Sequence, residues 1–91
     1  MDKRLIDNVQ DYKADSIKRL IPVSYKIKSS GKPEIGFVAQ QVQGVEPRII
    51  GTAANGLLNI DYEQLTVILL SYCQQLEERI ESLESKIKGK K

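Results

Sequence analysis

The most informative stretch of this chain is Gly36-Phe37-Val38-Ala39-Gln40-Gln41-Val42. It overlaps a short apolar run over residues 35–38, which is typical of a strand. Apolar residues then recur at positions 39, 42 and 45, which is helical spacing. Gly44 and Pro47 are residues at which helices commonly end. The stretch therefore predicts a strand over 35–38 followed at once by a short helix over 39–45.

Two hairpins are expected around this strand-to-helix step. Residues 23–28 alternate apolar and polar side chains, as in a half-buried strand, so we expect the first hairpin over 23–38. Its turn is predicted by composition at Ser29, Ser30, Gly31, Lys32 and Pro33. The second hairpin is expected from residues 48–50 and 57–60, which flank the Gly- and Asn-containing loop 51–56.

Two further elements are expected upstream. Leu5, Ile6 and Val9 are compatible with a short strand. Residues 11–20 are polar, and their apolar members have helical spacing, so they predict a helix that ends before Pro22. These apolar members are Ala14, Ile17 and Leu20, followed by Ile21.

The C-terminal third predicts one long helix over residues 62–88. Asp61 is a favourable N-cap, Gln64 stands at the capping-box position, and Gly89 is a natural end. At 1.5 Å per residue the helix is about 40 Å long, which exceeds what so small a domain can cover. Its far end must therefore pack against something else.

The same helix carries a heptad repeat. Its apolar positions alternate at spacings of four and three residues, as the d and a positions of a coiled coil do. They are Leu69, Cys73, Leu76, Ile80, Leu83 and Ile87. Arg79 at a g position and Glu84 at the following e position face each other between chains of a parallel coil, which favours that arrangement.

The heptads leave alternatives open. Ile at a with Leu at d favours dimers by the simple rule. An amphipathic helix packed on its own domain would explain the same spacing without a partner chain. Cys73 at an a position would place thiols near the axis of an oligomer, although a small buried apolar side chain is the simpler interpretation.

Composition excludes several classes of function. The 91 residues fit one domain with a marginal core, and a net charge of +2 with a short lysine-rich tail does not form the broad basic face that nucleic acid requires. The chain has no His and a single Cys, so neither a zinc site nor any other metal or cofactor site is expected. The longest apolar run, residues 67–70, is far shorter than the ~18–20 residues of a membrane span. We therefore expect no nucleic acid, membrane or cofactor partner.

An ordered set of motifs nevertheless resembles a known family. Leu20-Ile21-Pro22-Val23-Ser24-Tyr25, Ile35-Gly36-Phe37-Val38-Ala39-Gln40-Gln41-Val42, Pro47 and Ile60-Asp61-Tyr62 occur in the family's order. The set resembles the C-terminal intramolecular chaperone domain of phage endosialidases, tailspikes and tail fibres, which also occurs in the myelin regulatory factor. The resemblance extends over nearly the whole chain. It implies an α+β fold with small hairpins and short helices before a long helix that forms a parallel trimeric coiled coil.

The resemblance also implies a start motif, Ser-Asp-x-Arg-x-Lys, in which the Ser and Lys cut the chain beside the Ser. Asp2 and Arg4 match this motif, but Met1 and Ile6 occupy the Ser and Lys positions. A serine nucleophile needs a base, and Ile has no proton to exchange. Lys3 is a weak substitute, two or three positions out of place. The expectation is that no catalytic dyad is intact, and that Asp2 and Arg4 form a surface ion pair or touch a neighbouring chain.

Three hypotheses follow for a single domain, with a globular part at 1–61 and the helix at 62–88. The first is a homotrimeric folding module that follows a fibre or spike stem. The second is a self-cleaving serine–lysine endopeptidase domain whose nucleophile has been replaced. The third is an uncleaved receptor-binding tip, which would favour loop aromatics that 29–33 and 51–56 lack. The family's hairpins embrace the fibre, so the 29–33 turn is expected to contact the stem. The implied location is the host cytoplasm during virion assembly, or the virion tail if the domain is not released.

Overall fold

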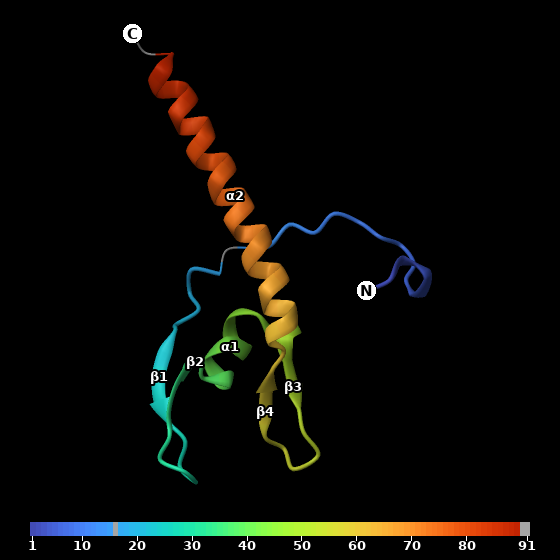
Figure 1. The fold of residues 1–91 in the computed structure, drawn as a ribbon, viewed down its shortest axis with the longest axis vertical. Helices are drawn as coiled ribbons and strands as arrows, with labels where there is room; N and C mark the ends of the chain where they lie inside the picture. The colour runs from blue at the N-terminus through green and yellow to red at the C-terminus, as the bar shows by residue number, and fades with distance from the viewer. Residues whose placement is uncertain (16, 90–91) are drawn as a thin grey trace.

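The fold combines two small antiparallel hairpins with one long helix (Figure 1). The structure is a computed structural model, and it describes residues 1–15 and 17–89. Its elements in chain order are η1 (Lys3–Leu5), β1 (Val23–Lys26), β2 (Pro33–Gly36), α1 (Ala39–Val45), η2 (Pro47–Ile49), β3 (Ile50–Thr52), β4 (Leu58–Ile60) and α2 (Tyr62–Lys88). The α+β class is confirmed, whereas the trimeric coil is a property of several chains and stays a prediction.

The predicted strand-to-helix step occurs at residues 36–39. Helix α1 has the predicted bounds, and the carbonyl of Val38 accepts from the N–H groups of Gln41 and Val42 at 3.0 and 3.1 Å. Val42 is fully buried beneath the step. The strand, however, is Pro33–Gly36 and not 35–38, because the backbone of Val38 already serves the helix as its N-cap.

The first hairpin therefore has a shorter turn than predicted. Its register pairs Val23 with Gly36 and Lys26 with Pro33, so Pro33 opens β2 and does not belong to the turn. Proline fits the first position of a strand, where its missing N–H leaves no gap in the ladder. Gly31 supplies the positive φ of 69° at the tip, and its N–H donates to the carbonyl of Ile27 at 2.7 Å.

The second hairpin forms where it was predicted, but β3 extends to Thr52 within the predicted loop and β4 begins at Leu58 and not at Leu57. Pro47–Ile49 form the 3₁₀ turn η2, so strand β3 begins at Ile50 and not at Arg48. Proline favours the first position of such a turn because its φ is already set. Ile49, 1% exposed, is carried into the core by this turn. Its carbonyl accepts from the N–H of Asp61 at 2.8 Å, which links the hairpin to the start of α2.

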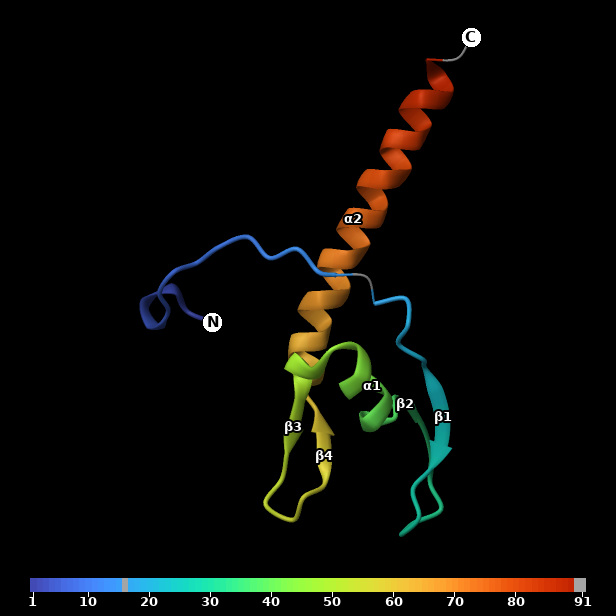
Figure 2. The same ribbon diagram turned by 180° about the vertical axis from the view of Figure 1, so that it is seen from behind.

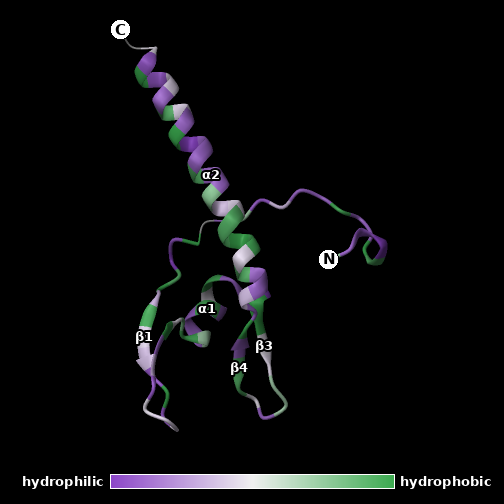
Figure 3. Ribbon diagram, in the orientation of Figure 1, coloured by the Kyte–Doolittle hydropathy of each residue, from purple (hydrophilic) through white to green (hydrophobic). Residues whose placement is uncertain are grey.

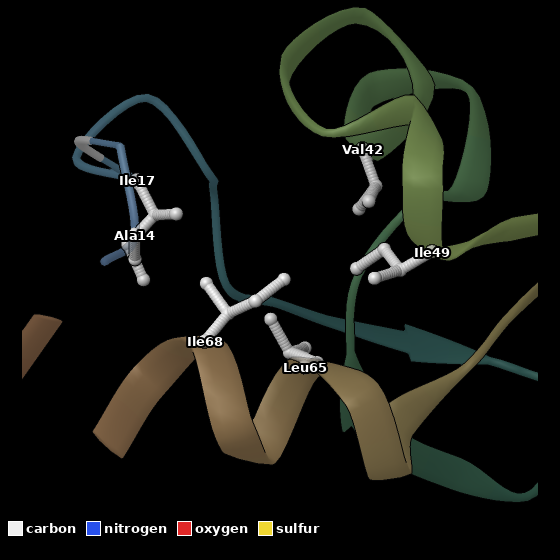
Figure 4. Packing of buried hydrophobic residues seen from close by; sticks show 6 residues of the cluster. All are labelled: Ala14, Ile17, Val42, Ile49, Leu65 and Ile68. Atoms are coloured by element: carbon white, nitrogen blue, oxygen red, sulfur yellow. The ribbon is translucent and has the colours of Figure 1, made fainter. Parts of the chain in front are cut away.

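The predicted helix over 11–20 is wrong. Among its described residues the chain forms no regular element and lies across α2 (Figure 2). The N–H of Ala14 donates to Ser71 Oγ at 3.0 Å, and its carbonyl accepts from Gln75 Nε2 at 3.0 Å. Side chains of α2 thus satisfy backbone groups that a local helix would have paired. Ala14 and Ile17 are still buried, so the apolar spacing served a tertiary contact (Figure 4).

Helix α2 has both predicted ends. Asp61 Oδ1 accepts from the N–H of Gln64 at 3.1 Å, which satisfies one of the donors left free at a helix start. Gly89 ends the helix, and its N–H donates to the carbonyl of Ser85 at 3.0 Å. The helix extends well beyond the hairpins, which gives the molecule an elongated outline of 61 × 38 × 21 Å (Figure 1).

The core lies where α2 meets α1, η2 and the segment that carries Ala14 and Ile17 (Figure 4). Its buried apolar members are Ala14, Ile17, Val42, Ile49, Leu65 and Ile68. Burying one large aliphatic side chain stabilises a fold by about 1.5–3 kcal/mol, and a chain of this length has a large conformational entropy to offset. Among the described residues, five such side chains and Ala14 make a small core, so a marginal stability is expected for the isolated chain.

Candidate assembly seam and N-terminal motif

The far half of α2 has no cover from its own chain. Residues 76–89 are exposed throughout. Figure 3 shows a mainly hydrophilic ribbon here, interrupted by hydrophobic residues. At 100° per residue the six predicted a and d positions fall within a stripe about 80° wide along the helix. All six are exposed, the apolar ones from Leu76 at 37% to Ile87 at 72%, and Cys73 is a free thiol among them. We name this stripe, Leu69–Cys73–Leu76–Ile80–Leu83–Ile87, the seam.

The near half of α2 uses a different face for its own domain. Leu65, Ile68 and Ser71 are buried there, and Figure 4 shows Leu65 and Ile68 pointing into the core. Ser71 Oγ donates to the carbonyl of Tyr12 at 3.1 Å while it accepts from Ala14. This buried face is centred about 100° round the helix from the seam. The globular part therefore leaves the seam uncovered, and packing on the chain's own domain does not account for it.

The predicted partners Arg79 and Glu84 both lie on the exposed part of α2. Their separation of five residues along one helix places them on the two flanks of the seam, as g and e positions require. A pair between chains stays a prediction, since it needs a second helix.

The N-terminal motif forms a small turn and not the predicted strand. Asp2 caps the 3₁₀ turn η1: its Oδ1 accepts from the N–H of Arg4 at 2.9 Å. The Arg4 guanidinium donates to both carboxylate oxygens, at 3.1 Å from Nε and 2.8 Å from the terminal nitrogen. These bonds, the side-chain contact first, hold the pKa of Asp2 below its ordinary value and raise the pKa of Arg4. Because the local bonds bend the backbone, Leu5 and Ile6 cannot continue as a strand.

The expected surface ion pair of Asp2 and Arg4 is thus present. The positions that the family motif gives to Ser and Lys are both exposed apolar residues, Met1 and Ile6. Lys3 lies in the turn and is also exposed, which is not the buried setting that a lysine base needs. As arranged here, the segment caps and folds itself, and neither motif position offers a group that could take up a serine proton.

The β1–β2 hairpin extends away from α2, and its turn is exposed (Figure 1). The tip is closed by local bonds, among them Lys32 N–H to Ser30 Oγ at 3.2 Å. The turn therefore has a defined shape without support from the body. Contact between Ser29–Pro33 and a stem stays a prediction.

A tyrosine cluster at the base of this hairpin was not predicted. The Tyr25 hydroxyl lies 3.5 Å from Glu34 Oε2. Desolvation, followed by the charge of Glu34 and the proximity of Tyr62, raises the pKa of Tyr25. A methyl group at Gly36 would lie 3.0 Å from the Tyr25 hydroxyl and 3.2 Å from that of Tyr62. A side chain at position 36 would therefore press on both hydroxyls where the hairpin meets the first turn of α2, and the signal in the sequence was the glycine itself.

A side-chain clamp also escaped prediction. Gln41 Nε2 donates to the carbonyl of Arg19 at 2.7 Å, and its Oε1 accepts from the N–H of Ile21 at 3.3 Å. In return the Arg19 guanidinium donates to the carbonyl of Gly44 at 3.3 Å. Helix α1 thereby fixes the irregular segment that leads into β1. The partners are 20 or more residues apart, and no local pattern indicates such a pair.

Two shallow apolar pockets flank the core. One is lined by Tyr12, Arg48, Gln64, Val67 and Ile68, with the Arg48 guanidinium 5.4 Å from the Tyr12 ring centroid. The other lies at the hairpin base and is lined by Pro22, Val23, Ile35, Gly36 and Phe37. Within residues 1–15 and 17–89, no cluster of three acidic or sulfur ligands is placed to hold a metal ion. No helix in that part of the chain combines the length and apolar character of a membrane crossing.

Comparison with known proteins supports the family resemblance over the first half of the chain. No curated protein matches the chain. A family described as chaperone of endosialidase matches residues 2–51, which is more than half of the sequence. The match includes η1, both strands of the first hairpin, α1 and η2, and it ends within β3 before the seam begins. The chain therefore belongs to the chaperone of endosialidase family, whose members are intramolecular chaperone domains of the endosialidase type.

Proposed function

We propose that this chain is a trimerisation and folding module at the C-terminal end of a viral tail fibre or tailspike. The observation that carries the proposal is the seam. Six apolar or thiol side chains stand exposed on a helix whose own domain covers another face. Six residues is also the size of the chain's buried apolar core, so association would double the number of buried apolar positions. A marginal domain would gain its stability in this way.

Three chains, and not two, are proposed for the assembly. Ile80 and Ile87 at a positions favour a dimer by the simple heptad rule. The seam is only about three heptads long, however, and the globular parts beside it influence the chain number. The family's fibres are trimeric, and a folding module must match the symmetry of the stem it serves. A three-fold axis along the seam would match the symmetry of the stem and would let the three globular parts support the short coil.

The experiment is Ile80→Asp, measured by sedimentation equilibrium at tens of micromolar. The wild-type chain should have the mass of a trimer. The variant should have the mass of a monomer, because each unpaired carboxylate in the seam costs several kcal/mol. Leu57→Asp is the matched control, since Leu57 is also an exposed apolar residue but lies in the second hairpin. A monomeric wild-type chain, or a trimeric Ile80→Asp variant, would refute the seam.

The proposed partner is the stem N-terminal to the module, and the β1–β2 hairpin is the proposed contact. Removing residues 29–33 and closing the turn in the full-length protein should leave the seam trimer intact while the yield of folded fibre falls. Loss of the trimer in this deletion would assign the hairpin to the core. Folding would take place in the host cytoplasm, and an unreleased module would stay on the virion tail.

Cleavage is the second question, because family members that cut themselves use Ser and Lys where this chain has Met1 and Ile6. We propose that the module stays attached. In a fusion to a folded stem, Met1→Ser alone should give no cut. Met1→Ser together with Ile6→Lys should restore one cut beside the new Ser, since a nucleophile and its base are both supplied. Mass spectrometry of the fusion over hours distinguishes the two, and a cut with Met1→Ser alone would assign the base to another residue such as Lys3.

A further inference from the structure

Residues 1–11 form an N-terminal arm, and all of them are exposed on their own protomer. It leaves the body at Tyr12 and extends to the side of α2 (Figures 1 and 2). Leu5 and Val9 are each 77% exposed, although η1 gives the arm a defined turn. The arm therefore offers a turn of defined shape with apolar side chains that a second chain could cover.

The four sides of α2 can be identified from residues 69–72, because each residue lies 100° further round the helix than the one before it. Leu69 lies in the seam, and Leu70 lies on an exposed flank. Ser71 faces the segment that crosses the helix, and Tyr72 packs on the core. The seam therefore stands between a Leu70 flank and a Tyr72 flank.

The arm and the first hairpin belong to opposite flanks. Tyr12 lines a pocket with Gln64, Val67 and Ile68 on the side of α2 away from the seam, and the arm runs from the helix in the direction opposite to the β1–β2 hairpin (Figures 1 and 2). Helix α1 and the β1–β2 hairpin lie on the other side of α2 in both views (Figures 1 and 2). If three seams meet on one axis, the Leu70 flank of each chain faces the Tyr72 flank of the next. Such a head-to-tail contact closes into a ring under three-fold symmetry.

On this basis, and resting on the trimer proposed above, we infer that each arm is held by the hairpin base of the neighbouring protomer. The receiving surface is the apolar pocket lined by Pro22, Val23, Ile35, Gly36 and Phe37. Ile35, one of the lining residues, is 86% exposed on its own chain. Leu5 and Ile6, at the turn of the arm, are the side chains that would enter it.

Reach and charge both agree with this contact. The stretch from Tyr12 back to Leu5 spans up to about 25 Å when extended, more than twice the 8–10 Å between packed helices. Residues 17–36 contain five basic side chains and one acidic, a net charge of +4, whereas residues 2–11 contain three acidic and two basic, a net charge of −1. Opposite net charges favour the encounter of the arm with the hairpin side.

The test joins two single-cysteine chains. One carries Leu5→Cys with Cys73→Ser, and the other, distinguished by a tag, carries Ile35→Cys with Cys73→Ser. After refolding together and mild oxidation, a disulfide should link one chain of each kind on a non-reducing gel. The control pair uses Leu57→Cys in place of Ile35→Cys, since Leu57 is a similarly exposed residue of the other hairpin. We expect at least a tenfold greater yield of linked chains for Ile35 than for Leu57, on the logic that only sulfurs brought within bonding distance join.

The outcomes separate this inference from the proposed function. A trimeric mass without the Ile35 link, or with equal links to Leu57, would overturn the arm exchange and leave the trimer in place. A monomeric mass would overturn both. A link that forms only within a chain carrying both Leu5→Cys and Ile35→Cys would show that the arm closes on its own hairpin, which also overturns the exchange.

Discussion

The two halves of α2 both carry apolar residues at spacings of three and four, yet they differ in what covers those residues. The near half buries Leu65 and Ile68 against the core, and the far half leaves Ile80, Leu83 and Ile87 in solvent. Helical spacing shows that some face of a helix will be covered. It does not show whether the cover comes from the same chain or from another. In this molecule the answer changes within one helix, where the globular part ends.

The largest expected effect tests this difference directly. Leu65→Ala should lower the free energy of unfolding by about 2–5 kcal/mol, because Leu65 is buried in a core with little else to fill the cavity. Leu83→Ala removes the same atoms from the exposed far half, so it should act through association alone. Urea unfolding followed by circular dichroism, at two protein concentrations roughly 100-fold apart, separates the two. Equal losses at the lower concentration would contradict the division of the helix.

A smaller effect is expected where the near half begins. Gly36→Ala should destabilise the fold by about 1–3 kcal/mol, because the new methyl group would crowd the hydroxyls of Tyr25 and Tyr62. Gly44→Ala is the matched control: it lies in α1 with open space around it, so it should stabilise by about 0.5–1 kcal/mol. Thermal unfolding of both variants checks the opposite signs. If Gly36→Ala left the stability unchanged, the packing of Tyr25 and Tyr62 around Gly36 would not contribute to holding the near half of α2.

The next effect concerns the start that both halves share. Asp61→Ala should lower stability by about 0.5–2 kcal/mol through loss of the bond to the Gln64 N–H. Asp61→Asn should retain most of the stability that the cap contributes, since asparagine caps a helix almost as well as aspartate. Circular dichroism at 222 nm during urea titration is the measurement. If the asparagine variant lost as much as the alanine variant, the charge of Asp61 and not its cap would be responsible.

The smallest effect lies outside α2, in the arm. Arg4 lowers the pKa of Asp2 from 3.8, so the ion pair contributes stability above that pH and loses it as the pH falls through the folded pKa. Because the pair is exposed, solvent screens it and the change in stability should be slight. An NMR titration of the Asp2 carboxyl should give a midpoint below 3.8, and Arg4→Gln should return it toward that value. A midpoint unchanged by Arg4→Gln would contradict the pairing.

Local signals predicted the parts of the fold that local bonds decide. Helices α1 and α2 have the expected bounds, because their ends depend on nearby residues. Val38 and Asp61 accept hydrogen bonds from the first turns, and Gly89 ends α2. Strand limits moved by two residues where Pro33 and η2 had been assigned to the wrong side of a boundary. The motif residues Asp2 and Arg4 were correctly expected to pair, since they are two residues apart.

Prediction failed where distant groups competed with local ones. Residues 11–20 have the spacing of a helix, but Ser71 and Gln75 of α2 bind the backbone of Ala14, and the described residues of that segment form no helix. The Gln41 clamp and the tyrosine cluster likewise join residues far apart in sequence or on separate elements. Such contacts replace local hydrogen bonds at no loss in their number, so propensity does not distinguish the two outcomes.

The sequence by itself determined that a long capped helix carries a heptad seam, that two hairpins precede it, and that the Ser and Lys of the family's start motif are missing. These depend on residue types and on spacings along the chain. Only the tertiary structure decided which face of α2 its own domain covers, and that the arm and the hairpin lie on opposite flanks of the seam. The physical reason is that burial is a property of surfaces brought together in space, and a one-dimensional pattern marks such a surface without naming its partner.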